Sequence, residues 1–154
     1  MRRVGLISDT HGLLREPVLE FLQGSDLILH AGDICDAHVL QRLGEIAPVT
    51  AVRGNNDWGP WADRIEESEL VTVDGVAIFI VHDLSHLPRH ARARAARVVV
   101  TGHSHKPVAQ EHDGVLFVNP GSAGPRRFKL PISAAELRIE GDQVSAHIRQ
   151  FEAA

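Results

Sequence analysis

The chain has 154 residues, of which 44% are hydrophobic and 23% are charged, a mixture typical of a folded protein rather than of a disordered one. We expect a single domain over residues 1–154, because about 100–200 residues is the usual size of one domain. The formal net charge of −4 argues against long nucleic acid as a partner. The lone Cys35 and the lack of an apolar run near the ~20 residues of a membrane span predict a cytoplasmic protein with no membrane partner.

The first half of the chain alternates strand and helix patterns. Strands are predicted at three short apolar runs, 2–8, 26–30 and 48–53. Helices are predicted at two segments with apolar residues at helical spacing, 14–23 and 36–45. Asp36 is suited to cap the second helix. This order of elements favours a parallel sheet.

The second half is richer in strands. Hairpins are predicted where an Asp-Gly or Gly-Asp pair separates two apolar runs: 68–73 with 76–82, 108–112 with 115–119, and 134–140 with 143–150. A short helix is predicted at 87–96 and a buried strand at 97–101. We therefore expect an α/β fold in which two mixed sheets pack together and helices cover the outside.

Residue types that bind metals follow five of the predicted strands. They occur as Asp9-Thr10-His11, His30-Ala31-Gly32-Asp33, Gly54-Asn55-Asn56-Asp57, His82-Asp83 and Gly102-His103-Ser104-His105. Ligands collect beyond the carboxyl ends of strands in open α/β sheets, so these segments should converge. Each motif alone is common as a turn or a helix cap, whereas the five together in this order favour a metal site.

This series of motifs resembles that of the calcineurin-like metallophosphoesterase superfamily. The short chain and Asn119-Pro120-Gly121-Ser122 make it similar to the small bacterial and archaeal phosphodiesterase branch. The resemblance implies a four-layer αββα sandwich with a dinuclear metal site at the carboxyl ends of the strands. It implies as ligands Asp9, His11, Asp33 and His105 for one ion, and Asp33, Asn55, His82 and His103 for the other, with Asp33 bridging both.

The implied ligand set also carries the expected chemistry. Asp33, Asn55 and His103 are catalytic candidates through the ions that they would hold, and Asp57 is a candidate either for orienting a ligand or for capping its turn. Carboxylate, amide and imidazole ligands suit two divalent transition-metal ions, Mn²⁺ first and otherwise Ni²⁺, Fe²⁺ or Zn²⁺. With two anionic ligands the site keeps a charge of about +2, which suits a small monoanionic phosphodiester. Two ions about 3.5–4 Å apart activate a bridging hydroxide for in-line attack on phosphorus.

The sequence departs from the pattern of the wider superfamily at two positions. Many members have a histidine that helps to protonate the leaving group at the position that Asn56 occupies here. Asp83 stands where glycine often follows the ligand histidine.

The alternative functions are a phosphomonoesterase and a metal-free protein-binding scaffold, like the retromer subunit that has this fold. A homo-oligomer is also considered, since dimers are common among small enzymes.

Overall fold

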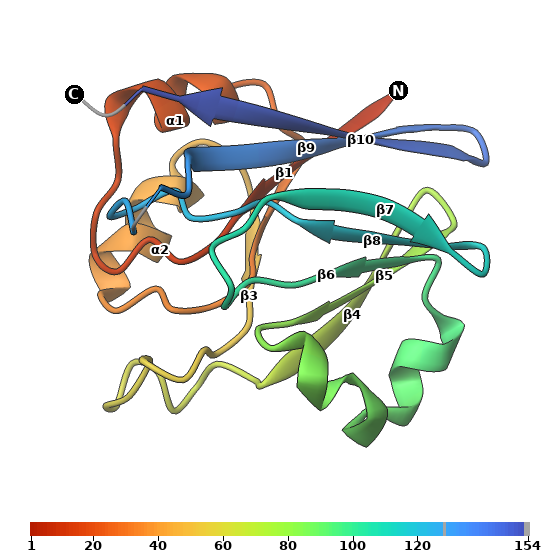
Figure 1. The fold of residues 1–154 in the computed structure, drawn as a ribbon, viewed down its shortest axis with the longest axis horizontal. Helices are drawn as coiled ribbons and strands as arrows, with labels where there is room; N and C mark the ends of the chain where they lie inside the picture. Colours follow the sequence, from red (N-terminus) through yellow and green to blue (C-terminus); the bar gives the residue numbers. More distant parts are fainter. Residues whose placement is uncertain (128, 153–154) are drawn as a thin grey trace.

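Two five-stranded sheets form the centre of the computed structural model, which describes residues 1–127 and 129–152 (Figure 1). The first sheet has the order β10 (Gln143–Phe151), β9 (Ile132–Glu140), β1 (Arg2–Ile7), β2 (Leu27–His30) and β3 (Val49–Ala51). Strands β1, β2 and β3 are parallel, as their alternation with helices predicts, and β9 runs antiparallel to β1.

The second sheet is mixed in the same way. Its order is β4 (Ser68–Val73), β5 (Val76–Val81), β6 (Val98–Val100), β8 (Val115–Asn119) and β7 (Val108–His112). Strands β5, β6 and β8 are parallel, and the antiparallel β4 and β7 form the edges. The three predicted hairpins are confirmed. The tight turn of β4–β5 has positive φ at Asp74 (47°) and Gly75 (85°), the geometry that two-residue hairpin loops prefer.

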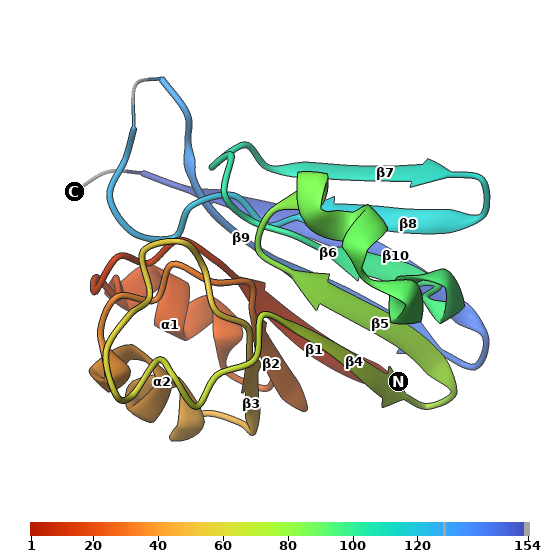
Figure 2. The same ribbon diagram turned by 90° about the horizontal axis from the view of Figure 1, so that it is seen from below.

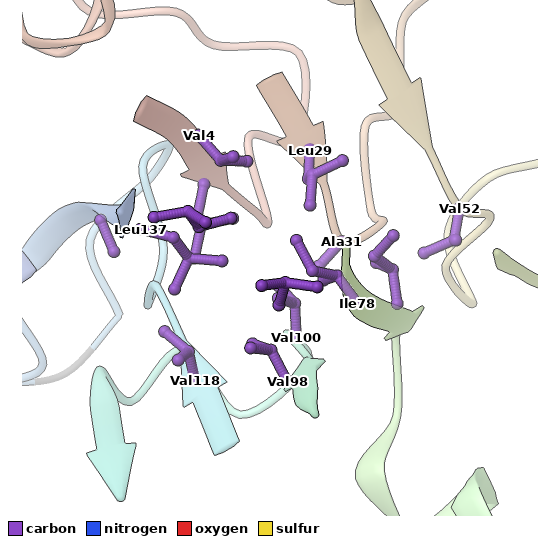
Figure 3. Close-up of a cluster of buried hydrophobic side chains, with 14 residues drawn as sticks. Val4, Leu29, Ala31, Val52, Ile78, Val98, Val100, Val118 and Leu137 are labelled. Atoms are coloured by element: carbon purple, nitrogen blue, oxygen red, sulfur yellow. The ribbon is translucent and has the colours of Figure 1, made fainter. Parts of the chain in front are cut away.

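The main core lies between the two sheets. Figure 3 shows the facing side chains, which include Val4, Leu29 and Leu137 on the first sheet and Ile78, Val98, Val100 and Val118 on the second. All of these are at most 1% exposed. Side chains alternate between the two faces of a strand, so each sheet has a second face that needs a cover of its own.

The helices α1 (Glu16–Leu22) and α2 (Ala37–Gly44) cover the outer face of the first sheet. Figure 2 shows both on the side of β1, β2 and β3 that is turned away from the second sheet. Their buried residues pack against Ile7 and Ile28. The predicted cap is confirmed, because the Asp36 carboxylate accepts a hydrogen bond from the His38 backbone N–H at 2.9 Å. In the described part of the chain, none of the helices is long and apolar enough to cross a bilayer.

The cover of the second sheet differs from the prediction. The single helix expected at 87–96 is replaced by two 3₁₀ helices, η1 (Leu84–Arg89) and η2 (Ala91–Ala95). The residues that face the sheet recur every three positions: Leu87, His90, Ala93 and Ala96. A spacing of three matches the three residues per turn of a 3₁₀ helix, whereas an α-helix would spread these side chains over half of its circumference.

Candidate metal centre

The five predicted segments meet at one edge of the sandwich. They follow β1, β2, β3, β5 and β6, and hydrogen bonds between their backbones join them. The Asp9 N–H donates to the Gly32 carbonyl at 3.0 Å, and the Gly102 N–H donates to the His82 carbonyl at 2.9 Å. The convergence expected from the strand order is therefore present.

Five of the seven predicted ligand residues have a left-handed backbone. Their φ angles lie between 46° and 70°: Asp9, His11, Asp33, His103 and His105. This conformation costs a residue with a side chain on the order of 1–3 kcal/mol, so it persists only where the surrounding structure enforces it. Strain of this kind concentrates at binding and catalytic sites.

Three of these side chains form a first cluster. Asp9 Oδ1 lies 3.9 Å from His11 Nε2 and 3.4 Å from His105 Nε2. Asp9 Oδ1 and His11 Nε2 are buried and have no hydrogen-bond partner among the described residues, which costs about 1–3 kcal/mol for each group. Two ligand atoms about 2.1 Å from a shared ion lie about 3 Å or more apart, so these distances suit an ion between them.

A second cluster contains Asp33 and His82. Asp33 Oδ2 lies 3.4 Å from His82 Nε2 and 3.7 Å from His11 Nε2, between the two clusters. The side-chain oxygen of Asn55 lies 3.0 Å from His82 Nε2 and 3.3 Å from His103 Nδ1. All seven predicted ligand residues thus lie near one another. Five of them form two groups with the spacing to hold a metal ion, Asp9 with His11 and His105, and Asp9 with Asp33 and His82, whereas Asn55 and His103 lie beside the second group.

The imidazole of His82 is oriented from behind. Its Nδ1 lies 2.7 Å from the Ala31 carbonyl oxygen, to which it donates. Nε2 thereby faces the Asp33 carboxylate and the side-chain oxygen of Asn55, and its proton donates to Asp33. A hydrogen bond of this kind on the far nitrogen is usual for histidines that bind metals, because it fixes the tautomer and the ring orientation.

Asn56 holds the carboxylate of Asp33. Its backbone N–H donates to Oδ1 and its side-chain amide donates to Oδ2, both at 2.9 Å. Burial opposes ionisation of Asp33, but hydrogen bonds from His82 and Asn56 outweigh it and keep the pKa of this carboxyl well below its usual range. Asp33 is therefore an anion at neutral pH. The sequence shows Asn56 only as a missing histidine and gives no sign of this contact.

Asp57 supports the backbone around the ligands. Its two carboxylate oxygens accept from the Cys35 N–H at 2.7 Å and from the Gly54 N–H at 2.9 Å. It thereby caps its own turn, as one of its two predicted roles has it, and ties the loop after β2 to the turn that presents Asn55. The other predicted role, that of orienting a metal ligand, stays a prediction. Burial, together with the charges of Asp57, Asp33 and Asp9, raises the pKa of the Cys35 thiol to about 11, so this group is a neutral thiol.

Sequence reasoning missed the groups that pack tightly behind the ligands. Ser8 Oγ donates to Asp9 Oδ2 at 2.7 Å, and the His103 N–H donates to the same oxygen at 3.1 Å. A Cβ atom on Gly102 would lie 2.1 Å from Ser8 Oγ and 2.8 Å from Asp9 Oδ2. One on Gly54 would lie 2.3 Å from Asp33 Oδ1. The sequence feature that could have indicated this close packing is the glycine directly before the ligand in both Gly54-Asn55 and Gly102-His103.

Two curated proteins are similar in sequence over most of this chain. A probable metallophosphoesterase of Methanothermobacter thermautotrophicus is 31% identical, with 94% of this chain and 90% of that protein covered. Phosphodiesterase YfcE of Escherichia coli is 29% identical, with 89% and 88% covered.

Solved structures share the fold. Vps29 of Chaetomium thermophilum matches with a TM-score of 0.84 at 20% identity, covering 98% of this chain and 88% of that one. An archaeal phosphodiesterase matches with a TM-score of 0.78 at 25% identity, covering 96% and 99%. Residues 2–142 match the model of the calcineurin-like phosphoesterase superfamily domain, and the chain therefore belongs to that superfamily of metal-dependent phosphoesterases.

Proposed function

We propose that this protein is a phosphodiesterase that hydrolyses small phosphodiesters at a dinuclear metal centre. The observation that carries the proposal is the pair of clusters around Asp9 and Asp33, in which buried ligand atoms face one another at distances that suit shared ions. When bound, two divalent ions, of which we expect Mn²⁺ first, supply an activated nucleophile for in-line attack and positive charge for the phosphoryl group.

The chain's own residues set the electrostatics of this site. Asp33 lies between the imidazoles of His11 and His82, which supports its proposed role as the bridging ligand, and Asn56 keeps it ionised and in place. With Asp9 and Asp33 as the anionic ligands, the loaded site keeps a charge of about +2, which complements a monoanionic diester. A dianionic monoester would require more positive charge, so the phosphomonoesterase reading is the weaker one.

Asn56 also bears on the leaving group. An amide has no proton of useful acidity, and this one is already bonded to Asp33. The departing oxygen therefore leaves without a proton from this position. Leaving groups such as phenols, whose pKa is near ~10, tolerate this, whereas simple alcohols do not.

The setting of the reaction is part of the proposal. The lone, half-buried Cys35 suits a reducing, cytoplasmic location. The negative net charge suits a small substrate better than long nucleic acid. A homo-oligomer of the chain stays a prediction.

The proposal is tested by metal analysis and a substrate screen. Protein stripped with a chelator and reloaded with Mn²⁺ should bind two ions and hydrolyse activated aryl phosphodiesters faster than alkyl monoesters. Asp33→Asn should abolish turnover and lower the occupancy of both ions. Asp142→Asn, in the exposed turn between β9 and β10, is the matched control and should change neither quantity. Full metal content and turnover in Asp33→Asn would disprove the dinuclear centre.

The same measurement addresses the scaffold alternative. A metal-free protein-binding scaffold would retain no stoichiometric metal after purification and would show no metal-stimulated hydrolysis. The complete set of ligand residues argues for the enzyme, because a scaffold has no need to bury Asp9, Asp33 and His82 together and to strain the backbone of the two aspartates.

A further inference from the structure

An apolar cavity lies directly beside the metal centre. Its volume is about 210 Å³, and it lies between the start of η1 and the hairpin of β7 and β8. Three apolar side chains on its wall are Leu84, Val108 and Phe117, and polar residues of the ligand-bearing loops complete the lining. We propose that this cavity, the aryl pocket, binds an aromatic ester group of the substrate. The inference rests on the proposed phosphodiesterase function and specifies its substrate class.

The position of His103 connects the aryl pocket to the reaction site. This histidine lines the cavity, and its Nδ1 lies 3.3 Å from the side-chain oxygen of Asn55. Its side chain is 48% exposed, so one part of the ring faces the other ligands while another part is open to a bound molecule. Asp83, which lines the cavity too, lies 3.8 Å from His103 Nε2. A phosphodiester at the metal centre thus has the pocket as its immediate neighbour.

The size and charge of the aryl pocket favour a neutral ring. A dry apolar cavity of about 150 Å³ accommodates benzene, so the present volume accommodates one aromatic group. The charged residues on the wall, Asp83 and Lys106, have opposite signs and offset each other. A neutral, flat substituent therefore suits the cavity better than a second phosphate or a sugar alone.

Exposed apolar side chains around the metal centre give independent support. In the part of the chain that the structure describes, the large apolar residues that are exposed are Met1, Leu13, Trp58 and Leu84. All but Met1 follow a predicted ligand by two or three positions: His11, Asn55 and His82 respectively. Exposed apolar side chains in the loops that carry the ligands favour a ligand with apolar parts, because water otherwise disfavours that surface; of the three, Leu84 lines the aryl pocket itself.

The experiment measures affinity without turnover. Calorimetric titrations of the Mn²⁺-loaded protein compare methyl(phenyl)phosphinate with dimethylphosphinate. Both are monoanions like a phosphodiester, both have only P–C bonds to their organic groups and so cannot be hydrolysed there, and they differ only in phenyl against methyl. We expect the phenyl compound to bind about tenfold more tightly, a difference of about 1.4 kcal/mol. Burial of about 55 Å² of apolar surface suffices for this difference, less than one aromatic side chain buries in a protein.

Variants locate the preference in the aryl pocket. Phe117→Ala and the half-exposed Leu84→Ala should each lower the tenfold ratio to about threefold or less, and neither replaces a metal ligand. Val115→Ala is the matched control: it lies on the same face of β8 and lines the neighbouring cavity under the 3₁₀ helices, so the ratio should not change.

Two results would overturn the aryl pocket. The first is equal affinity for both phosphinates, or no measurable binding of methyl(phenyl)phosphinate at millimolar concentration. The second is a phenyl preference that Phe117→Ala and Leu84→Ala leave intact. Leu84→Ala keeps the test valid if Phe117→Ala does not fold. Failure of the proposed function has a different signature, since it appears as absent diester hydrolysis in the Mn²⁺-loaded wild-type protein.

Discussion

Acid should destabilise this protein through His30, which lies behind the metal centre at the end of β2. The side chain is fully buried, its Nδ1 accepts from the Gly32 N–H at 3.1 Å, and its Nε2 lies 3.1 Å from Thr10 Oγ1. The acceptor role of Nδ1 fixes the neutral tautomer with hydrogen on Nε2. A second proton would face the Gly32 N–H, and burial lowers the pKa of His30 from 6.5 to about 3.

The sign and size of the effect follow from proton linkage. The folded state has the lower pKa, so the unfolded state takes up the proton first as pH falls. Above pH ~6.5 neutral His30 makes its full contribution to the free energy of unfolding. As the pH falls towards ~3 this contribution is lost, by at most about 1.4 kcal/mol per pH unit. Between pH 7 and pH 5 the free energy of unfolding should fall by about 2 kcal/mol through this residue, against a total of about 5–15 kcal/mol for a typical domain.

Urea unfolding of metal-free wild type and His30→Asn at pH 7, 6 and 5 measures this contribution. Asparagine keeps an acceptor for the Gly32 N–H but does not titrate. Between pH 7 and pH 5 the free energy of unfolding of His30→Asn should therefore fall by about 2 kcal/mol less than that of the wild type. His147→Asn on the exposed side of β10 is the control and should follow the wild type. The same pH dependence in wild type and His30→Asn would refute the reasoning.

Three further predictions concern the metal centre. His11→Ala should weaken mainly one of two ions, and metal analysis should find close to one ion per chain; loss of both would contradict the division into two clusters. Gly102→Ala should lower the free energy of unfolding, measured in urea, by about 3 kcal/mol or more, because the new Cβ meets Ser8 and Asp9. The control is Gly44→Ala at the end of α2, which has free space around it and should be neutral or stabilising by up to about 1 kcal/mol. Asn56→His should accelerate poor leaving groups more than good ones, seen as a shallower dependence of kcat/KM on leaving-group pKa, and an unchanged slope would remove Asn56 from the explanation.

Much of the fold was accessible from the sequence, because its strongest patterns are local. Apolar runs, Asp-Gly turns and the cap at Asp36 each act within a few residues, and the strands and hairpins that they predict are present. The convergence of the candidate ligands was predictable for a related reason, since the ends of parallel strands share one edge of a sheet.

The missed features depend on contacts between distant segments. The 3₁₀ helices place an inward-facing side chain at every third residue. This spacing can be recognised only once the sheet on which these side chains pack is known. The bonds from Asn56 to Asp33 and the close approach of Gly102 to Ser8 join residues 23 and 94 positions apart. No local pattern in the sequence encodes such distances.

The two clusters of ligands have a mechanical consequence for the sandwich. The first combines Asp9 and His11, which follow a strand of the first sheet, with His105, which follows a strand of the second. The other combines Asp9 and Asp33 with His82 in the same way. Ions bound at both groups would therefore link the two sheets at one end of the sandwich. Their binding free energy would then add to the free energy needed to separate the sheets. A chain of this architecture that bound no metal would have to close that end by other means.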